Sequence, residues 1–456
     1  MLSKIKKTIS KIEIFASTKK ALIGFIILLY VLFSYLSYDY SIKDNGYYNY
    51  NSTLWADKSG YYVYLPALFV YNFDGEKMPV AIEDKVGLGF YIDKETHKII
   101  TKYTAGVAML TFPFFLIAHV SAVIQGCGDG FGPPYHQMVA FVAPFFALLG
   151  LVFLFLFLIN YVRKRTAFFT CLILLTGTNL FYYTVSDGYM SHAYSFFLFA
   201  LLLYSSKKYI DTGYAVKWFS ILVASIFFIV LIRPTDFLVF LIIPFIYFSG
   251  FKNVKTLISS FFTIKKLAII LALFVLIIGP QMLYWKYASG SWFVYSYGNE
   301  GFKYIASPKI LEVLFSARCG LLIYNPLYII LLASLIYYLF IDFKKAIWLL
   351  LLIVIVIYII ASWHSWFYGC SYGIRPMVQY TAVLALPFAI MIKRLEKRPL
   401  FKNIIMVLVI LTTIYSLIIV YSYDRCYLGD DWNYSEYFKY IDKFGINDII
   451  CNYLNN

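Results

Sequence analysis

Long apolar runs alternate with short polar segments along almost the whole chain of 456 residues. About 20 apolar residues in an α-helix are enough to cross the roughly 30 Å hydrocarbon core of a bilayer. No separate soluble domain is evident between the runs. The pattern therefore predicts an all-α polytopic membrane protein with about eleven transmembrane helices, at residues 22–38, 137–161, 166–184, 192–206, 217–232, 237–250, 267–285, 321–340, 343–361, 377–392 and 403–421.

Two further apolar runs lie in the predicted first outer loop, residues 39–136. The run at 61–71 reaches only about 16 Å as a helix, so it is too short to cross. The run at 103–124 is long enough, but it contains Pro113 and His119. We expect both runs to form juxtamembrane helices on the outer face.

The distribution of charge gives the direction of the helices. Hydrophobic residues make up 61% of the chain and charged residues 14%, which excludes an ordinary soluble protein. The formal net charge is +15, but the lysines and arginines lie in brief clusters between apolar runs, which argues against nucleic acid as a partner. With residues 103–124 on the outer face, the cytoplasmic segments hold 23 basic and four acidic residues, as the positive-inside rule requires.

This topology places the N-terminus in the cytoplasm, ahead of an uncleaved first helix. Residues 1–421 form one transmembrane domain, and residues 422–456 form a short outer-facing tail. The expected location is a bacterial cytoplasmic (inner) membrane.

Ionisable residues gather at the predicted outer helix ends and outer loops. A charge at the bilayer centre costs at least about 2.5 kcal/mol, so such residues usually face a cavity or a partner. The asymmetry predicts one outward-facing polar site, whereas a transporter places its binding groups near the midplane and shows two related halves. The residues concerned are Asp57, Lys102, Asp187, His192, Arg233, Asp236, Glu300, Arg318, His364 and Arg375.

Two pairs in this set have two interpretations each. Asp187 and His192 flank an outer turn and suit a shared pocket, but they are fewer than the three or four ligands of a zinc site, so we predict no metal site. Arg233 and Asp236 surround a proline, and they either close the turn as an ion pair or contact substrate.

The residue types around the outer site favour a phosphate and a sugar as ligands. Arginine matches the geometry of phosphate oxygens, and tryptophan and tyrosine rings suit sugar faces. The sequence has no Walker loop, no G-x-S-x-G and no H-E-x-x-H, so the energy for a reaction has to come with the substrate. A lipid-linked glycan flippase or transporter, and a glycan polymerase or ligase, remain the alternatives.

Five segments together resemble a known family: "WADKSGYYVYLPALF", "TKYTAGVAMLTFPFF", "VSDGYMSHAYSFF", "LFSARCGLLIYNPL" and "WFYGCSYGIRPMVQYTAVLALPF". They are similar to segments of the GT-C class of integral-membrane glycosyltransferases, in the group of protein O-mannosyltransferases and the lipid A aminoarabinose transferase. The resemblance spans most of the chain. It implies a catalytic transmembrane domain that moves a sugar, with inversion, from a polyprenyl-phosphate donor to an acceptor hydroxyl outside the membrane.

The resemblance also implies roles for individual residues. Asp57 matches the catalytic base, and Lys102 matches a lysine that contacts the donor phosphate. Lys58 departs from the pattern, because many relatives carry a second acid there, and this weakens a paired-carboxylate or metal role. The sequence requires no cofactor. Assistance by a divalent cation is without support but stays open, as do the donor sugar and the acceptor (protein, lipid A or surface glycan). The substrate-binding candidates are Lys102, Tyr61, Tyr62, Asp187, His192, Arg233, Glu300, Arg318, His364 and Arg375.

Overall fold

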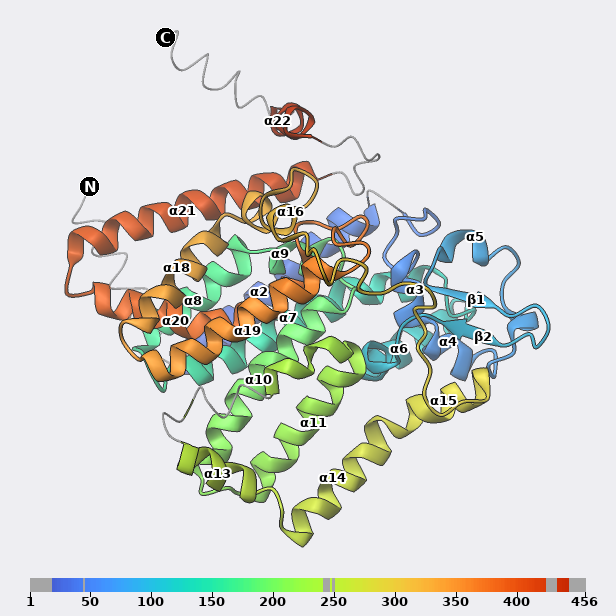
Figure 1. The fold of residues 1–456 in the computed structure, drawn as a ribbon. Coiled ribbons are helices and arrows are strands. Elements are labelled where there is room, and N and C mark those ends of the chain that lie inside the picture. Colours follow the sequence, from blue (N-terminus) through green and yellow to red (C-terminus); the bar gives the residue numbers. More distant parts are fainter. Residues whose placement is uncertain (1–18, 44–45, 241–246, 248–250, 424–432, 443–456) are drawn as a thin grey trace. The chain divides into compact units, whose positions relative to one another are not determined.

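The computed structural model describes residues 19–43, 46–240, 247, 251–423 and 433–442. The described chain is mostly helical (Figure 1). It divides into two compact units, one made of Met1–Phe168 with Tyr183–Gly298 and the other of Phe169–Tyr182 with Asn299–Asn456. The units are therefore described one at a time.

The first unit is built around the packing of α10 along α7. Gly150, in the middle of α7, allows the close approach, because a Cβ there would lie 2.9 Å from the Phe196 ring and from Cα of Phe197. α6 covers another side of α7, where Phe115 stacks on Tyr135. The longer helices of this unit are α2 (Lys19–Tyr38), α6 (Gly106–Ile124), α7 (Pro133–Leu158), α10 (His192–Asp211), α11 (Val216–Ile232), α13 (Phe251–Ser259), α14 (Ile264–Ile277) and α15 (Gly279–Ser289), with the short helices η1 (Asp39–Lys43) and η3 (Pro234–Phe237).

The second unit has a core rich in tyrosine. Tyr372 stacks on Tyr182 with ring centroids 4.8 Å apart, and it meets Tyr324 and Tyr423 edge-on. Tyr437 of α22 packs on Tyr324, which docks this last helix on the unit. Its helices are α16 (Ile310–Phe315), α17 (Leu321–Tyr324), α18 (Leu327–Leu339), α19 (Phe343–Ser362), η4 (Arg375–Met377), α20 (Thr381–Leu395), α21 (Pro399–Ser422) and α22 (Tyr434–Asp442), while α8 (Lys164–Gly177) and α9 (Leu180–Val185) contribute residues to both units.

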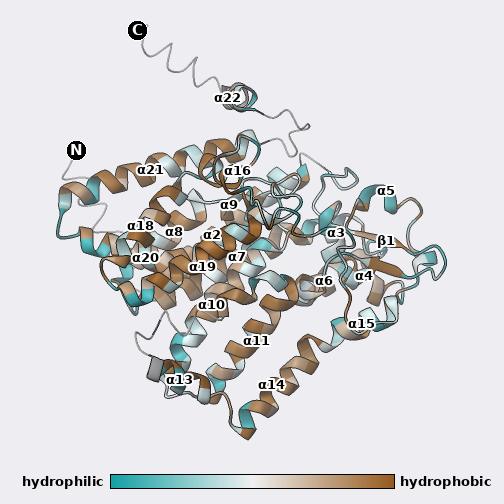
Figure 2. Ribbon diagram, in the orientation of Figure 1, coloured by the Kyte–Doolittle hydropathy of each residue, from teal (hydrophilic) through white to brown (hydrophobic). Residues whose placement is uncertain are grey.

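Among the described residues, five helices are long and apolar enough to cross a membrane, or six if the bent pair α13–α14 counts as one span. Figure 2 shows the apolar character along helices such as α14 and α19. Four of the five coincide with predicted runs, and the fifth is α6, whose location on the outer face stays a prediction. The five are Lys20–Lys43, Gly106–Ile124, Pro133–Leu158, Phe343–Ser362 and Pro399–Ser422.

The predicted count of eleven is not confirmed, because breaks shorten several runs. The run at 166–184 is divided between α8 and α9, and the run at 321–340 is divided at Asn325–Pro326 into α17 and α18. Proline has no amide hydrogen to continue the helical ladder, which explains the second break. The run at 237–250 lies largely outside the described residues.

The first outer loop contains a β-hairpin, so the all-α prediction is wrong there. β1 (Phe90–Ile92) pairs antiparallel with β2 (Ile99–Thr101), with Tyr91 opposite Ile100. The carboxylate of Asp93 shapes the turn by accepting hydrogen bonds from the amides of Glu95 and Thr96. The other elements of the loop are α3 (Asp57–Tyr62), α4 (Tyr64–Phe69), η2 (Gly75–Lys77) and α5 (Glu83–Val86).

The short apolar run of this loop forms two buried helices, α3 and α4, which meet at Val63. Residues 58–67 are buried, and exposure begins at Leu68 and Phe69. The run therefore contributes to the core of the first unit instead of presenting a continuous apolar face to lipid.

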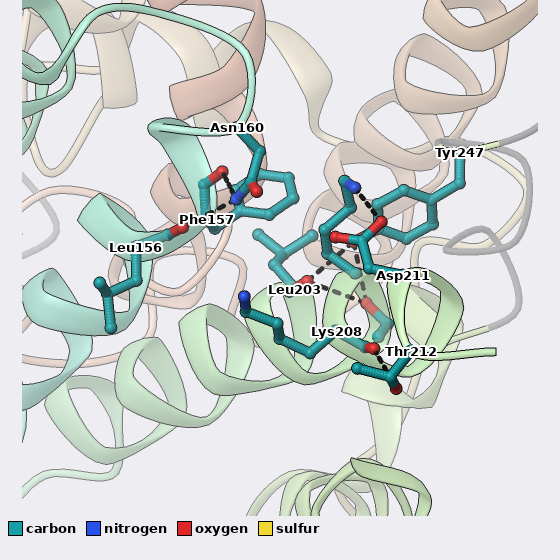
Figure 3. Close-up of polar contacts among 10 residues, drawn as sticks. Leu156, Phe157, Asn160, Leu203, Lys208, Asp211, Thr212 and Tyr247 are labelled. Atoms are coloured by element: carbon teal, nitrogen blue, oxygen red, sulfur yellow. Dashed lines mark hydrogen bonds and ion pairs between the residues drawn. The ribbon is translucent and has the colours of Figure 1, made fainter. Parts of the chain in front are cut away.

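Polar side chains at the predicted cytoplasmic ends of α7 and α10 bind helix carbonyls (Figure 3). Asn160 donates its amide to the carbonyls of Leu156 and Phe157 at 2.8 and 2.9 Å. The hydroxyl of Thr212 donates to Lys208 O at 2.7 Å. The last carbonyls of a helix lack intrahelical partners, so these side chains cap the C-terminal ends of the two helices by donating hydrogen bonds to them.

Gly60 fixes the distance between α3 and the hairpin. A Cβ at Gly60 would collide with the carbonyl oxygen of Gly89 and lie 2.6 Å from the Tyr103 ring. The Thr101 hydroxyl also donates to Gly60 O at 2.8 Å. Only a residue without a side chain leaves room for this contact.

Replacing Gly60 by alanine is expected to lower the free energy of unfolding by about 1–3 kcal/mol, since backbone atoms have to move apart. Thermal unfolding of the purified protein in detergent measures the effect. Gly24→Ala is the matched control, because a Cβ at Gly24 has no atom within 4 Å. Equal melting temperatures for the two variants would contradict the close contact.

Candidate functional site

α3 carries the predicted base at its first position, directly after a strained residue. Ala56 has φ 53° and ψ −140°, a left-handed conformation that is uncommon for a residue with a Cβ. Its amide donates to Lys85 O at 3.0 Å, and its carbonyl accepts from the Ser59 hydroxyl at 2.7 Å. These contacts hold the backbone in a conformation that costs energy, as is common next to functional residues.

Asp57 itself is half-buried. Its negative charge lies close enough to Tyr50 to raise the pKa of that phenol, in addition to the larger effect of partial burial. The Asp57 carboxylate is therefore near the surface of the first unit, beside a tyrosine from the preceding loop.

Lys58 joins α3 to the turn between α9 and α10. Its ammonium lies 2.9 Å from Oδ1 of Asp187, and the two side chains are only 8% and 13% exposed. Adjacent helical residues point about 100° apart, so Asp57 and Lys58 leave α3 in different directions. The ion pair ties Asp187 to the residue next to Asp57.

Tyr61 connects the same turn with the segment around Lys102. Its ring stacks on Tyr103 with centroids 4.2 Å apart, and its hydroxyl lies 3.3 Å from Ser191 Oγ. His192 follows Ser191 as the first residue of α10, where its buried ring lies 4.8 Å from the ring of Tyr183. α3 thus contacts both the Asp187–His192 turn and the Lys102 segment.

The ammonium of Lys102 lies over aromatic rings. It is 5.1 Å from the ring centroid of Tyr297 and 5.9 Å from that of Tyr103, within the range of cation–π attraction. The Ser296 hydroxyl donates to the carbonyl of Lys102 at 2.6 Å. The beginning of the long loop after α15 therefore folds over Lys102.

A buried polar network holds the backbone just after Lys102. Tyr64 donates its hydroxyl to Tyr103 O at 2.7 Å, and the amide of Ala105 donates to Gln281 at 2.7 Å. Burial raises the pKa of Tyr64 well above its ordinary value, so this phenol stays a neutral donor. Two hydrogen bonds thus fix the backbone that follows Lys102.

Arg233 pairs with Asp236 across the turn that follows α11. Arg233 Nε lies 3.7 Å from Oδ2 of Asp236, which confirms the ion-pair interpretation of this motif. Thr104 donates its hydroxyl to the carbonyl of Leu231, so the turn begins beside the Lys102 segment. A substrate contact by Arg233 stays a prediction.

Tyr62 lies in the core of the unit. Its side chain is 0% exposed, its hydroxyl donates to Gly130 O at 2.5 Å, and its ring packs edge-on against Tyr189. The structure gives Tyr62 a packing role, and its predicted substrate contact stays a prediction.

The other four predicted residues, Glu300, Arg318, His364 and Arg375, belong to the second unit, and each of them lies in or contacts the loop after α19. The Arg318 guanidinium lies 3.5 Å above the centre of the Phe367 ring, and that of Arg375 lies 5.9 Å from the Tyr368 ring. His364 Nε2 lies 4.0 Å from Glu300 Oε2. The predicted convergence of these four with Asp57 stays a prediction.

The residues of the site do not form a metal-ligand set. No group of three or more His, Cys, Asp or Glu side chains suited to a metal ion occurs in the part of the chain that the structure describes. Lysine ammonium is a donor without a lone pair, so Lys58, whose Nζ lies 2.9 Å from Oδ1 of Asp187, cannot itself ligate a metal ion.

Sequence reasoning missed three contributors. The family pattern marks Lys58 only as a departure, although a buried lysine generally needs an acidic partner. His136, in "GPPYHQ" at the start of α7, is fully buried, and its Nδ1 lies 2.9 Å from Thr53 Oγ1, four residues before Asp57. Tyr297 carries no spacing signal that would link it to Lys102.

No family model matches the chain, and no curated protein sequence matches it. One solved structure to which it is similar is the crystal structure of the Archaeoglobus fulgidus oligosaccharyltransferase in complex with zinc and sulfate, at a TM-score of 0.43 and 14% identity. The match covers 86% of this chain and 52% of that chain, so this chain spans about half the length of the solved one. At this level the likeness does not establish a shared fold, and function has to be argued from the site.

Removing one partner of the buried pair should be costly, because the other charge stays buried and unpaired. Lys58→Met is expected to lower the free energy of unfolding by about 3–5 kcal/mol, and the double variant Lys58→Met/Asp187→Leu to recover most of it. Thermal unfolding in detergent provides the measurement.

Lys77→Met is the matched control, because Lys77 makes a pair of the same length, 2.9 Å, with Asp74 while 64% exposed in the same loop. An exposed pair contributes about 0–1 kcal/mol. Equal losses in Lys58→Met and Lys77→Met would contradict the importance of the buried pair.

Proposed function

We propose that the chain is a GT-C-type glycosyltransferase that transfers a sugar, with inversion, from a polyprenyl-phosphate donor to an acceptor hydroxyl on the extracytoplasmic face. The observation that carries the proposal is the position of α3. Through Lys58–Asp187 and Tyr61–Tyr103, this one short helix joins the predicted base Asp57 to an acidic turn and to the predicted phosphate-binding lysine.

In the proposed reaction, Asp57 removes the proton of the acceptor hydroxyl. The acceptor oxygen then forms a bond to the anomeric carbon from the face opposite the phosphate, and the bond from that carbon to the phosphate oxygen breaks. The electron pair leaves with the lipid phosphate. General-base catalysis of this kind contributes about 10²–10⁴-fold to the rate.

The phosphate gains charge as it leaves, so fixed cations near it stabilise the transition state more than the ground state. Lys102 is the candidate in the first unit, because its backbone is held by the network of Tyr64 and Gln281. Arg318 and Arg375 are the candidates in the second unit, where each guanidinium lies over an aromatic ring.

The proposed extracytoplasmic orientation is supported by Cys370. This residue lies in the loop that carries His364 and Arg375, and it is disulfide-bonded. Disulfides persist in oxidising compartments and are rare in the cytosol. The loop thus has chemistry typical of the outer face, as the charge count predicts for it.

Asp57→Asn is expected to reduce sugar transfer by about 10²–10⁴-fold, because the amide cannot accept the acceptor's proton. Release of sugar from a polyprenyl-phosphate donor in reconstituted membranes measures it, after mass spectrometry of co-purified lipid has identified the sugar. Asp84→Asn, at an exposed acid of the same loop, is the control. Full turnover by a folded Asp57→Asn variant would refute the assignment of the base.

Lys102→Met is expected to raise the KM for the donor and to lower kcat, by about tenfold or more in kcat/KM, since a charge-assisted contact to phosphate contributes about 1.5–3 kcal/mol. The comparison is with Lys94→Met, at an exposed lysine in the turn of the hairpin. If both variants keep the wild-type KM for the donor, Lys102 does not bind its phosphate.

A further inference from the structure

The Lys58–Asp187 pair lies where two acidic segments of the first unit meet. Asp57 and Asp187 are far apart in sequence, and Lys58 of α3 reaches Asp187 with an Nζ–Oδ1 distance of 2.9 Å. A lysine in this position is a positive charge that the chain itself supplies to the carboxylate of Asp187.

A divalent cation would need a different set of groups. Mg²⁺ takes about six oxygen ligands and Zn²⁺ about four ligands, and carboxylates supply several of them. Here Oδ1 of Asp187 accepts a hydrogen bond from an ammonium, which repels a second cation and offers no lone pair. Both side chains are largely buried, so solvent screens this repulsion little.

We propose that Lys58 is a positioning residue that takes the place of a divalent cation: its ammonium fixes Asp187 beside α3, and sugar transfer runs without a metal. The part about transfer rests on the proposed function. The part about the cation does not, because it concerns the groups that Asp187 can bind.

Binding of Mn²⁺, followed by electron paramagnetic resonance on the full chain in lipid nanodiscs, tests the cation part directly. The wild-type protein is expected to show no site that depends on Asp187. Lys58→Glu places a carboxylate where the ammonium was, and is expected to bind Mn²⁺ at least about tenfold more tightly than wild type. Lys94→Glu, at the exposed hairpin turn, controls for the added charge.

Two results would overturn this part of the proposal. The first is Mn²⁺ binding by wild type that Asp187→Asn abolishes. The second is a folded Lys58→Glu variant that binds no more Mn²⁺ than Lys94→Glu. If Lys58→Glu does not fold, Lys58→Gln decides, because it removes the charge without adding another and is expected to admit Mn²⁺ beside Asp187.

Turnover tests the positioning part. EDTA should leave wild-type transfer unchanged, Lys58→Arg should keep most of it, and Lys58→Gln should lose about a hundredfold through misplacement of Asp187. Mn²⁺ should restore transfer in Lys58→Glu and not change Lys94→Glu. Loss of wild-type transfer in EDTA that Mn²⁺ restores would overturn the proposal. Absence of transfer in wild type under all conditions would instead refute the proposed function, and the Mn²⁺-binding experiment would then decide the cation part alone.

Discussion

The buried ion pair between Lys58 and Asp187 is the contact on which the arrangement of the first unit's site depends. A buried charge is stable only while it is paired with an opposite charge. The Lys58–Asp187 pair therefore restricts the position of the α9–α10 turn relative to α3. Nonpolar packing could join the same segments, but without setting the direction of a carboxylate. The pair therefore gives the site its geometry as well as its charge.

Packing at α3 complements this electrostatic contact. Gly60 admits the carbonyl of Gly89, and the ring of Tyr61 lies flat on Tyr103. One face of the short helix thus meets the hairpin while Lys58 reaches the acidic turn. A six-residue helix has little stability of its own, so these tertiary contacts, together with the strained backbone at Ala56, decide where Asp57 lies.

Four of the five long apolar helices among the described residues coincide with predicted spans, because their signal is a property of composition over many residues, whereas the count of eleven is not confirmed. The sequence predicted Asp57, Lys102 and Asp187 in one outer site from the gathering of ionisable residues at outer helix ends, and the family resemblance added their roles. The structure shows the contacts of Lys58 with Asp187 and of Tyr61 with Tyr103, and the site itself stays a prediction. Sequence reasoning missed the hairpin at Phe90 and the breaks within apolar runs, because short strands and broken helices depend on tertiary contacts. Lys58 could not be interpreted correctly, since its partner lies 129 positions away.

The ring of Tyr297 over Lys102 has a consequence for affinity. If the donor phosphate binds Lys102 as proposed, it meets an ammonium that already lies 5.1 Å from the centre of the Tyr297 ring, and a shift of the loop carrying Tyr297 would strengthen the phosphate contact. The apparent dissociation constant of the donor then contains the equilibrium of the loop as well as the intrinsic contact. Solvent or temperature conditions that favour the shifted loop would then lower the apparent dissociation constant of the donor without any change in the residues that contact it.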